Sequence, residues 1–333
     1  MAWKILVTAR TINEVGRDAV ALLQKAGCEV IIAPKLGPLK MDDLLPQLEG
    51  KDAALISPDQ FNAEVLASPS AARLKIISRW GVGYDSIDIA AATKQGIIVA
   101  YTPGFLNETV ADYTFALLLT LARRVHEAHQ MMEAGDWKLL WGGDVFGKTL
   151  GIVGCGRIGQ AVAKRASGFN LRLLGYDVAP HPEAEKLGIK FVSFDELLAQ
   201  SDFVSLHCAL TPQNQGLFDE TAFRKMKPGA LLVNTARGAL VNEPALVKAL
   251  REKLIGGAAL DVFAREPLPA DHLFKNVPNL LLSPHMAPCG RETGERVSMA
   301  AAQAIVDAMN GRQPQMVVDP TVFQSPALRI KLK

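Results

Sequence analysis

The chain has 333 residues, of which 49% are hydrophobic and 21% are charged. A chain of this length predicts about two domains, and its composition is typical of a globular protein and not of a disordered one. With 36 basic and 34 acidic residues its net charge is +2, which argues against an extended nucleic-acid-binding surface.

The sequence does not favour a membrane span, a metal site or a disulfide framework. The longest uncharged apolar stretch, 113–122, has only about half of the roughly 20 residues that a membrane span needs, so we expect a buried helix there. The four cysteines show no CxxC spacing, which fits a reducing compartment. We therefore expect a cytoplasmic protein without a metal, and neither nucleic acid nor a membrane as its partner.

Short apolar strands alternate with helical patterns in the first hundred residues. Strands are predicted over 4–8, 29–33, 53–57, 74–78 and 97–100, and an amphipathic helix over 14–26. Strands separated by helices predict βαβ units and a parallel sheet. A helix over 107–124 follows that is too apolar on all sides for a surface position. It is either a domain-core helix or a helix at a domain or subunit interface.

A second series of strands begins near residue 150. Strands are predicted over 150–153, 171–176, 203–207, 230–234, 258–262 and 280–283, with a helix over 243–253 among the patterns between them. The two series predict an α/β protein with two doubly wound parallel sheets. We expect the break between them near Pro103-Gly104.

The strongest local signal is a glycine-rich turn directly after the predicted strand over 150–153. It reads Gly154-Cys155-Gly156-Arg157-Ile158-Gly159 and precedes a helical pattern over 160–167. In this context the glycines allow a tight turn, a close approach of a pyrophosphate to the backbone, and close packing of helix on strand. The N–H groups at the start of the helix then favour phosphates. The pattern predicts a dinucleotide-binding site.

An acidic residue follows at the spacing expected for a ribose ligand. Asp177 ends the next predicted strand, near the spacing of about 20 residues that is typical of dinucleotide-binding folds. A carboxylate there accepts hydrogen bonds from the ribose hydroxyls and repels a 2′-phosphate, and the five residues after it include no Lys or Arg. The pattern favours NAD over NADP. The alternative is that Asp177 is a turn residue before Pro180.

Three reactive side chains follow later strands, at the sheet edge where α/β proteins bind ligands. They are Arg237, Glu266 and His285. An arginine binds a carboxylate through two parallel hydrogen bonds, and a histidine transfers a proton to or from a carbonyl oxygen. A neighbouring glutamate would orient the imidazole and favour its charged form. With a hydride acceptor, this set can interconvert a 2-hydroxy acid and a 2-keto acid, although each residue alone has an ordinary structural alternative.

In these motifs the chain resembles the D-isomer-specific 2-hydroxyacid dehydrogenase family. The matching stretches, in chain order, are 81–85, 108–112, 154–159, 234–238, 260–267 and 284–287. The resemblance implies that Arg237 holds the substrate carboxylate, that His285 is the acid/base and that Glu266 is its partner. It also implies that Asp261 reaches the nicotinamide amide. The implied cofactor site consists of Val82, Gly154, Gly156, Arg157, Ile158, Gly159, Asp177, Cys208, Thr235, Ala236 and Asp261.

The resemblance also implies a layout that local patterns do not give. A Rossmann NAD domain over 104–287 is inserted into a flavodoxin-like substrate domain formed by 1–103 and 288–333, and a helix over 291–310 returns to the first part. A homodimer is implied, with an interface that usually includes the helix over 107–124 and its neighbourhood. For Trp137 and Trp141 we expect core packing, although in some relatives an aromatic from this region reaches the partner's active site.

The substrate is expected to be a small 2-keto or 2-hydroxy acid. The loop Gly81-Val82-Gly83 is expected to present N–H groups to its carboxylate, and Arg79 is a further candidate. Asp59 argues against a phosphorylated substrate, because phosphoglycerate-binding relatives often carry a basic residue there. The favoured function is an NAD-dependent reductase of the glyoxylate or hydroxypyruvate type. The alternatives are a 3-phosphoglycerate dehydrogenase and an NAD-sensing, corepressor-like binding protein.

Overall fold

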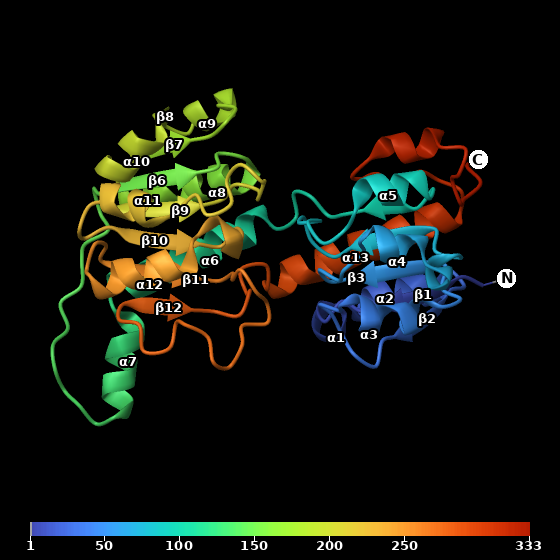
Figure 1. Ribbon diagram of the computed structural model, residues 1–333, viewed down its shortest axis with the longest axis horizontal. Helices are drawn as coiled ribbons and strands as arrows, with labels where there is room; N and C mark the ends of the chain where they lie inside the picture. The colour runs from blue at the N-terminus through green and yellow to red at the C-terminus, as the bar shows by residue number, and fades with distance from the viewer. Residues whose placement is uncertain (1) are drawn as a thin grey trace. The chain divides into compact units, whose positions relative to one another are not determined.

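The computed structural model describes residues 2–333. The chain forms two compact units, of which the first consists of Met1–Leu106 and Cys289–Lys333 and the second of Asn107–Pro288. Each unit contains one sheet with helices on both faces (Figure 1), and all pairs of neighbouring strands in the described residues are parallel. The prediction of two α/β units with parallel sheets is confirmed.

The described residues of the first unit form a five-stranded sheet with the order β2-β1-β3-β4-β5. This is the strand order of flavodoxin-like folds. The strands are rich in Ile, Val, Leu and Ala because helices cover both faces of the sheet. Their bounds are β1 (Lys4–Val7), β2 (Glu29–Ile32), β3 (Ala53–Ile56), β4 (Ile76–Arg79) and β5 (Ile98–Ala100).

Two groups of helices cover this sheet. The helices of the unit are α1 (Thr11–Val15), α2 (Arg17–Lys25), α3 (Met41–Leu48), α4 (Ala63–Ala67), α5 (Ile89–Lys94) and α13 (Arg291–Met309), with short 3-10 turns η1 (Pro69–Ala71) and η4 (Pro320–Gln324). Residues of α3, α4 and α5 form a core with one face of the sheet, and α13 packs against α1, α2 and β4. The single helix predicted over 14–26 is wrong in one respect. Gly16, a poor helix former, separates α1 from α2.

The second unit has a seven-stranded sheet with the order β12-β11-β10-β9-β6-β7-β8. The order reverses between β6 and β9, and in open α/β sheets such a switch point is where ligands bind. The strand β8 was not predicted, because a charged residue, Lys190, interrupts its three-residue run and leaves no apolar stretch. The strands are β6 (Thr149–Val153), β7 (Arg172–Tyr176), β8 (Ile189–Phe191), β9 (Phe203–Leu206), β10 (Leu231–Asn234), β11 (Gly257–Leu260) and β12 (Leu280–Leu282).

The helices of the second unit lie on both faces of its sheet (Figure 1). They are α6 (Asn107–Ala122), α7 (Val125–Glu133), α8 (Arg157–Ala166), α9 (Pro182–Glu185), α10 (Phe194–Gln200), α11 (Glu220–Lys225) and α12 (Glu243–Arg251), with 3-10 turns η2 (Ser167–Phe169) and η3 (Gly238–Leu240). The helix α6 is a core helix, because it buries Leu117, Leu118 and Leu121 against α8, β10 and β11. Within the described residues, no helix is long and apolar enough to cross a bilayer.

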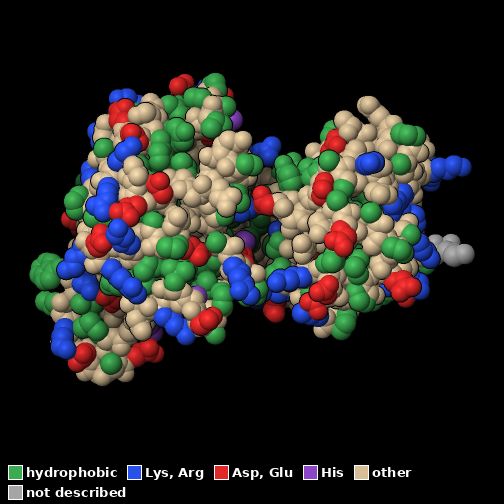
Figure 2. Space-filling view, in the orientation of Figure 1, with side chains coloured by type: hydrophobic (Ala, Val, Ile, Leu, Met, Phe, Trp, Pro, Cys, Tyr) green, Lys and Arg blue, Asp and Glu red, His purple; other side chains and the backbone are tan. Residues whose placement is uncertain are grey.

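A segment with exposed hydrophobic side chains follows α6. None of the nine residues of α7, all of them described, is buried. In the loop that follows, Trp137 is 86% exposed, Leu139 83% and Trp141 87%. Figure 2 shows hydrophobic side chains at the left edge of the surface, over this loop. The expectation of core packing for Trp137 and Trp141 is therefore wrong, because the loop runs over the outside of the second unit's core.

Candidate active site

The predicted site residues of the second unit follow the carboxyl ends of its parallel strands. The carboxyl ends of parallel strands meet at one edge of a sheet, so these residues lie along one edge. Gly154 follows β6, Asp177 follows β7, Cys208 comes shortly after β9, Thr235, Ala236 and Arg237 follow β10, Asp261 and Glu266 follow β11, and His285 follows β12.

The glycine-rich turn has the geometry that a pyrophosphate requires. Gly154 has a φ of +92°, and a Cβ there would lie 2.6 Å from the carbonyl carbon of His207. A Cβ at Gly159 would meet the backbone of Gly154, so the start of α8 packs closely on the turn. At Gly156, by contrast, nothing lies within 4 Å of a Cβ, which leaves the backbone open to a ligand. The turn thus fits the phosphates of NAD.

Asp177 lies against this turn. One carboxylate oxygen, Oδ2, accepts a hydrogen bond from the backbone N–H of Cys155 at 2.7 Å, and Oδ1 accepts one from Ala179 at 3.1 Å. The carboxylate is therefore held beside the glycine turn, at the end of the neighbouring strand β7. Arg157 and Ile158 are the first residues of α8, and no side chain in the described part of the chain caps the start of this helix, where backbone N–H groups lack partners within the helix.

Glu266 and His285 form a hydrogen-bonded pair. The Nδ1 atom of His285 lies 2.7 Å from Oε2 of Glu266, and Oε1 accepts a hydrogen bond from the N–H of Phe263 at 3.0 Å. The other ring nitrogen of His285, Nε2, makes no hydrogen bond with any residue in 2–333. The side chains are 34% and 28% exposed, so the pair is accessible to a small molecule.

The electrostatics of the pair keep Glu266 ionised. Burial acts to raise the pKa of Glu266, but the hydrogen bond and the charge of His285, the N–H of Phe263 and the charge of Arg237 outweigh it, so that the pKa lies below its ordinary value. An ionised Glu266 can only accept hydrogen bonds. It therefore holds a proton on Nδ1 of His285 and leaves Nε2 as the nitrogen that can exchange a proton with a substrate.

Arg237 stands on a loop that is held from two sides. The side chain of Asn234 donates to the carbonyl oxygen of Arg237 at 2.9 Å and accepts from the N–H of Ala236 at 3.0 Å. The hydroxyl groups of Thr235 and of Thr114 on α6 are 3.1 Å apart. Sequence reasoning gave no role to Asn234 or Thr114. The role of Asn234 could have been predicted from its position between a strand and a turn, because Asn side chains form hydrogen bonds with backbone groups of turns.

Asp261 is fully buried behind the histidine. Its carboxylate accepts hydrogen bonds from the hydroxyl of Ser283 at 2.6 Å and from the N–H groups of Met286 and Ala287, both at 2.8 Å. Burial raises the pKa of Asp261, although these three hydrogen bonds act against it. All three donors belong to the segment that carries His285.

Buried polar groups near the turn do not take part in acid/base chemistry. Burial lowers the pKa of His207 to about 3 and raises that of Cys208 to about 11 and that of Cys155 to about 12. The imidazole and both thiols are therefore neutral near pH 7. Within the described residues, no group of three or more His, Cys, Asp or Glu side chains could hold a metal ion.

The remaining predicted residues belong to the first unit, where Arg79 ends β4 and the loop 81–83 follows it. Gly81 has a φ of +123°, and its N–H donates to the hydroxyl of Thr102 at 2.9 Å. Arg79 donates from Nε to the carbonyl oxygen of Gly83 at 2.9 Å and also donates to that of Trp80. Arg79 thus supports the backbone of the loop 81–83, and Val82 is half-buried at its centre.

The structure does not support the use of Asp59 as evidence about the substrate. Asp59 is fully buried, and its carboxylate accepts hydrogen bonds from the hydroxyl of Thr8 and from the N–H of Leu39 at 2.6 Å. A buried carboxylate with these partners holds a loop in place and meets no substrate. Its presence therefore says nothing about whether a substrate carries a phosphate.

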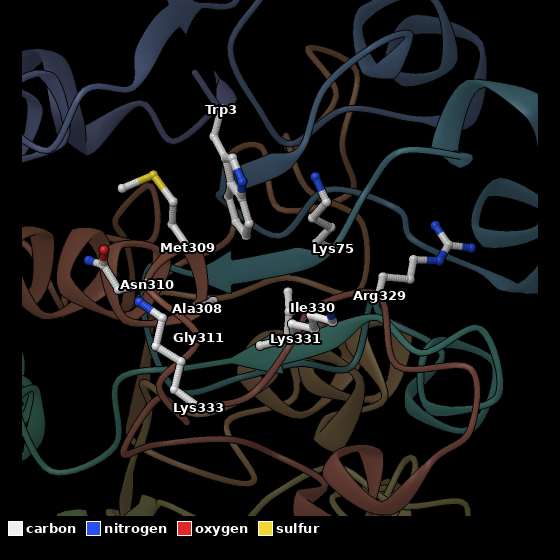
Figure 3. A pocket seen from close by; sticks show the side chains of 10 residues that line it. All are labelled: Trp3, Lys75, Ala308, Met309, Asn310, Gly311, Arg329, Ile330, Lys331 and Lys333. Carbon is white, nitrogen blue, oxygen red and sulfur yellow. The ribbon is translucent and has the colours of Figure 1, made fainter. Parts of the chain in front are cut away.

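A hollow of about 300 Å³ in the first unit is lined by Trp3, Lys75, Arg329 and neighbouring residues (Figure 3). Two of its cations, Lys75 and Arg329, serve the fold. The ammonium of Lys75 lies 2.6 Å from the buried carboxylate of Asp52 and 4.7 Å from the centre of the Trp3 ring. The guanidinium of Arg329 donates to backbone carbonyl oxygens, among them that of Gln95 at 2.8 Å. None of the predicted site residues lines this hollow.

Replacing Gly156 by Ala should separate cofactor binding from folding. Its φ is −71° and a Cβ would find open space, so Tm should stay unchanged. A methyl group would hold a pyrophosphate off the backbone, and we expect the Kd for NADH, measured by fluorescence titration, to rise by about tenfold or more, that is by about 1.4 kcal/mol. Gly168→Ala is the matched control, because nothing lies within 4 Å of a Cβ there either. An unchanged Kd in Gly156→Ala would contradict the assignment of this turn.

Comparison with known proteins places this geometry in a family. Residues 115–287 match the family model described as D-isomer specific 2-hydroxyacid dehydrogenase, NAD binding domain. The chain is 46% identical over 273 residues to a glyoxylate reductase of Korarchaeum cryptofilum, covering 80% of this chain and 82% of that protein. It is 40% identical over 340 aligned positions to a glyoxylate reductase of Thermofilum pendens, covering 99% and 98%.

A solved structure agrees with the family model and with the two relatives. The crystal structure of the TT0316 protein from Thermus thermophilus is similar to this chain with a TM-score of 0.86 and 40% sequence identity, covering 95% of this chain and 100% of that one. The match extends over both units. The chain therefore belongs to the D-isomer specific 2-hydroxyacid dehydrogenase family and is an NAD-dependent enzyme.

Proposed function

We propose that this protein reduces a small 2-keto acid of the glyoxylate or hydroxypyruvate type to the D-2-hydroxy acid, with Arg237, Glu266 and His285 as its catalytic residues. The observation that carries the proposal is the 2.7 Å hydrogen bond between His285 and Glu266 at the sheet edge that also bears the glycine turn. The relatives described as glyoxylate reductases favour this substrate over 3-phosphoglycerate. The complete Arg, Glu and His set favours an enzyme over a binding protein.

Each side chain has a defined task in this reaction. NADH, when bound, supplies the hydride that the keto carbon receives. The guanidinium of Arg237 binds the substrate carboxylate through two hydrogen bonds and so orients the carbonyl group. Nε2 of His285 donates a proton to the carbonyl oxygen, which becomes the hydroxyl group. Glu266 keeps the proton on Nδ1 and stabilises the charged imidazole before the transfer. In the reverse direction His285 takes the proton from the hydroxyl group.

The remaining assignments follow the sequence-based interpretation. We assign 104–287 to an NAD domain, with a cofactor site made of Gly154, Gly156, Arg157, Ile158, Gly159, Asp177, Cys208, Thr235 and Ala236. We assign 1–103 and 288–333 to a substrate domain, in which the N–H groups of Gly81, Val82 and Gly83 bind the substrate carboxylate. Arg79 supports that loop and adds positive charge to it, and Val82 also contacts the cofactor.

We further propose a cytoplasmic homodimer. The hydrophobic side chains of α7 and its following loop are exposed, and Val125, Met132, Trp137, Leu139, Trp141 and Phe146 are between 54% and 87% exposed. Large hydrophobic side chains exposed in such number on one segment favour an interaction site. A second copy of the chain is the occupant we propose, because a projecting segment can pair with its own equivalent around a two-fold axis. In residues 2–333 no cysteine forms a disulfide, which supports a reducing compartment.

The activity is tested with NADH and a panel of plain and phosphorylated 2-keto acids, by following the absorbance of NADH. We expect turnover of glyoxylate or hydroxypyruvate, and a fall in kcat of about 10²–10⁴-fold in His285→Ala, because proton transfer contributes that much. His129→Ala, which removes an exposed histidine on α7, should keep the wild-type rate. Normal turnover in His285→Ala would exclude this residue as the proton donor. Tight NADH binding without turnover of any acid would support the binding-protein alternative.

Asp177 should determine the choice between NADH and NADPH. In Asp177→Ala the ratio of kcat/KM for NADH to that for NADPH should fall by about tenfold or more, because the repulsion of the 2′-phosphate is lost. Asp177→Asn keeps an oxygen for the N–H of Cys155 and should show the same change in ratio with the turn intact. A wild-type ratio in both variants would remove Asp177 from this role.

The dimer is tested by light scattering after size-exclusion chromatography. The double substitution Trp137→Ser with Trp141→Ser should convert the wild-type dimer into a monomer, because it removes the two most exposed aromatic side chains of the loop. Val178→Ser, at a residue that is 93% exposed elsewhere on the second unit, is the matched control and should remain dimeric. A monomeric wild type, or a double variant that stays dimeric, would argue against this interface.

A further inference from the structure

The buried residue Asp261 makes an unusual set of contacts with one short segment. Its side chain is not exposed at all, and its carboxylate accepts three hydrogen bonds, from Ser283, Met286 and Ala287. Its backbone carbonyl oxygen accepts a fourth, from the N–H of His285 at 2.8 Å. The donors all belong to the turn 283–287, which joins β12 to the rest of the chain and carries His285 at its centre.

This turn needs such support, because His285 has a strained backbone. Its φ is +55°, in the left-handed region where a residue other than glycine is strained and persists only when its surroundings hold it. The conformation also points the N–H groups of Met286 and Ala287 toward the buried carboxylate of Asp261, and a buried donor without a partner is destabilising. One carboxylate satisfies both N–H groups and the hydroxyl of Ser283.

We propose that Asp261 is a positioning residue, whose buried carboxylate holds the turn 283–287 so that the imidazole of His285 meets Glu266 and presents Nε2 to the substrate. This inference rests on the proposed role of His285 as the proton donor. It differs from the role that the family resemblance implies for Asp261, a contact with the nicotinamide amide. In this structure both carboxylate oxygens already accept hydrogen bonds from the turn.

The chemistry of the donors makes the inference testable with a variant of the same size. Oδ1 accepts from Ser283 and Met286, and Oδ2 accepts from Ala287. In Asp261→Asn one oxygen becomes an NH₂ group, and in either orientation of the amide this group faces a backbone N–H. Two donors then oppose each other, and the turn loses at least one of its anchors.

The experiment has two separate measurements. Hydrogen exchange of the protein without cofactor reports on the turn, and steady-state kinetics report on the reaction. In Asp261→Asn we expect the amide protons of 285–287 to exchange faster with solvent than in the wild type. We expect kcat to fall by about 10²-fold, the effect of a misplaced catalytic group. Because Arg237 holds the substrate carboxylate and the glycine turn holds the cofactor, the KM for the keto acid and the Kd for NADH should change far less than kcat. A general loss of folded protein would not confine faster exchange to 285–287. Faster exchange there, with a lower kcat and a KM that changes far less, therefore indicates a misplaced turn in a folded protein.

Two further variants complete the test. Ser283→Ala removes one donor and leaves the carboxylate bound to both N–H groups, so its kcat and exchange rates should lie between those of the wild type and of Asp261→Asn. Asp202→Asn is the matched control. This carboxylate precedes β9, at the opposite edge of the sheet, and accepts hydrogen bonds from the N–H of Thr149 at 2.9 Å and from Lys227 at 2.8 Å. Its loss should leave kcat and the exchange of 285–287 unchanged.

Two results would overturn the inference. One is wild-type kcat and exchange in Asp261→Asn, and the other is a weaker Kd for NADH with unchanged exchange, which would indicate a nicotinamide contact instead. If Asp261→Asn does not fold, Ser283→Ala is judged by the same exchange and kcat measurements, and wild-type values in both would overturn the inference. If the wild-type protein turns over no keto acid, the proposed function is wrong. The exchange measurement would still test whether Asp261 holds the turn.

Discussion

The parallel pairing of the strands in the second unit is the constraint on which the candidate active site depends. In a parallel sheet all strands end at the same edge, so residues far apart in the chain come together where their strands end. Arg237 follows β10, Asp261 and Glu266 follow β11, and His285 follows β12. These three strands are neighbours in the sheet. The glycine turn follows β6, at the point where the strand order reverses, and this places the cofactor turn and the reactive side chains on one edge.

Buried polar side chains fix the loops that extend beyond this edge. Asn234 holds the loop of Arg237 through two backbone hydrogen bonds, and Asp261 accepts hydrogen bonds from the turn of His285. Phe263 donates its N–H to Glu266, which in turn accepts from the imidazole. A buried polar group is costly unless its hydrogen bonds are satisfied, so each of these contacts favours a single loop conformation. The reactive side chains are thereby placed before a substrate arrives, which is how positioned groups lower a barrier.

The sequence was sufficient to predict the features that depend on local pattern. Runs of β-branched and apolar residues indicated most strands, and the six residues from Gly154 to Gly159 indicated the turn at the start of α8. The positions of Arg237, Glu266 and His285 after strands indicated that they lie at one sheet edge. These signals work because strand periodicity and glycine geometry are properties of short segments.

Features that depend on tertiary packing could not be predicted in this way. Trp137 and Trp141 are apolar residues that the pattern placed in a core, yet they are exposed, because burial depends on where a loop runs. Asp59 is a charged residue that in the sequence argued against a phosphorylated substrate, yet it is buried and hydrogen-bonded to Thr8. The contacts of Asp261 with the turn 283–287 join residues that are 22 to 26 positions apart in the chain, and no local pattern records them.

The most direct test of the account is a crystal structure of the protein with NADH and oxamate, an unreactive analogue of a 2-keto acid. The account predicts the pyrophosphate of NADH against the turn 154–159, the oxamate carboxylate on the guanidinium of Arg237, and its carbonyl oxygen within hydrogen-bond distance of Nε2 of His285. Oxamate bound away from Arg237 and His285, or NADH bound away from the glycine turn, would contradict it.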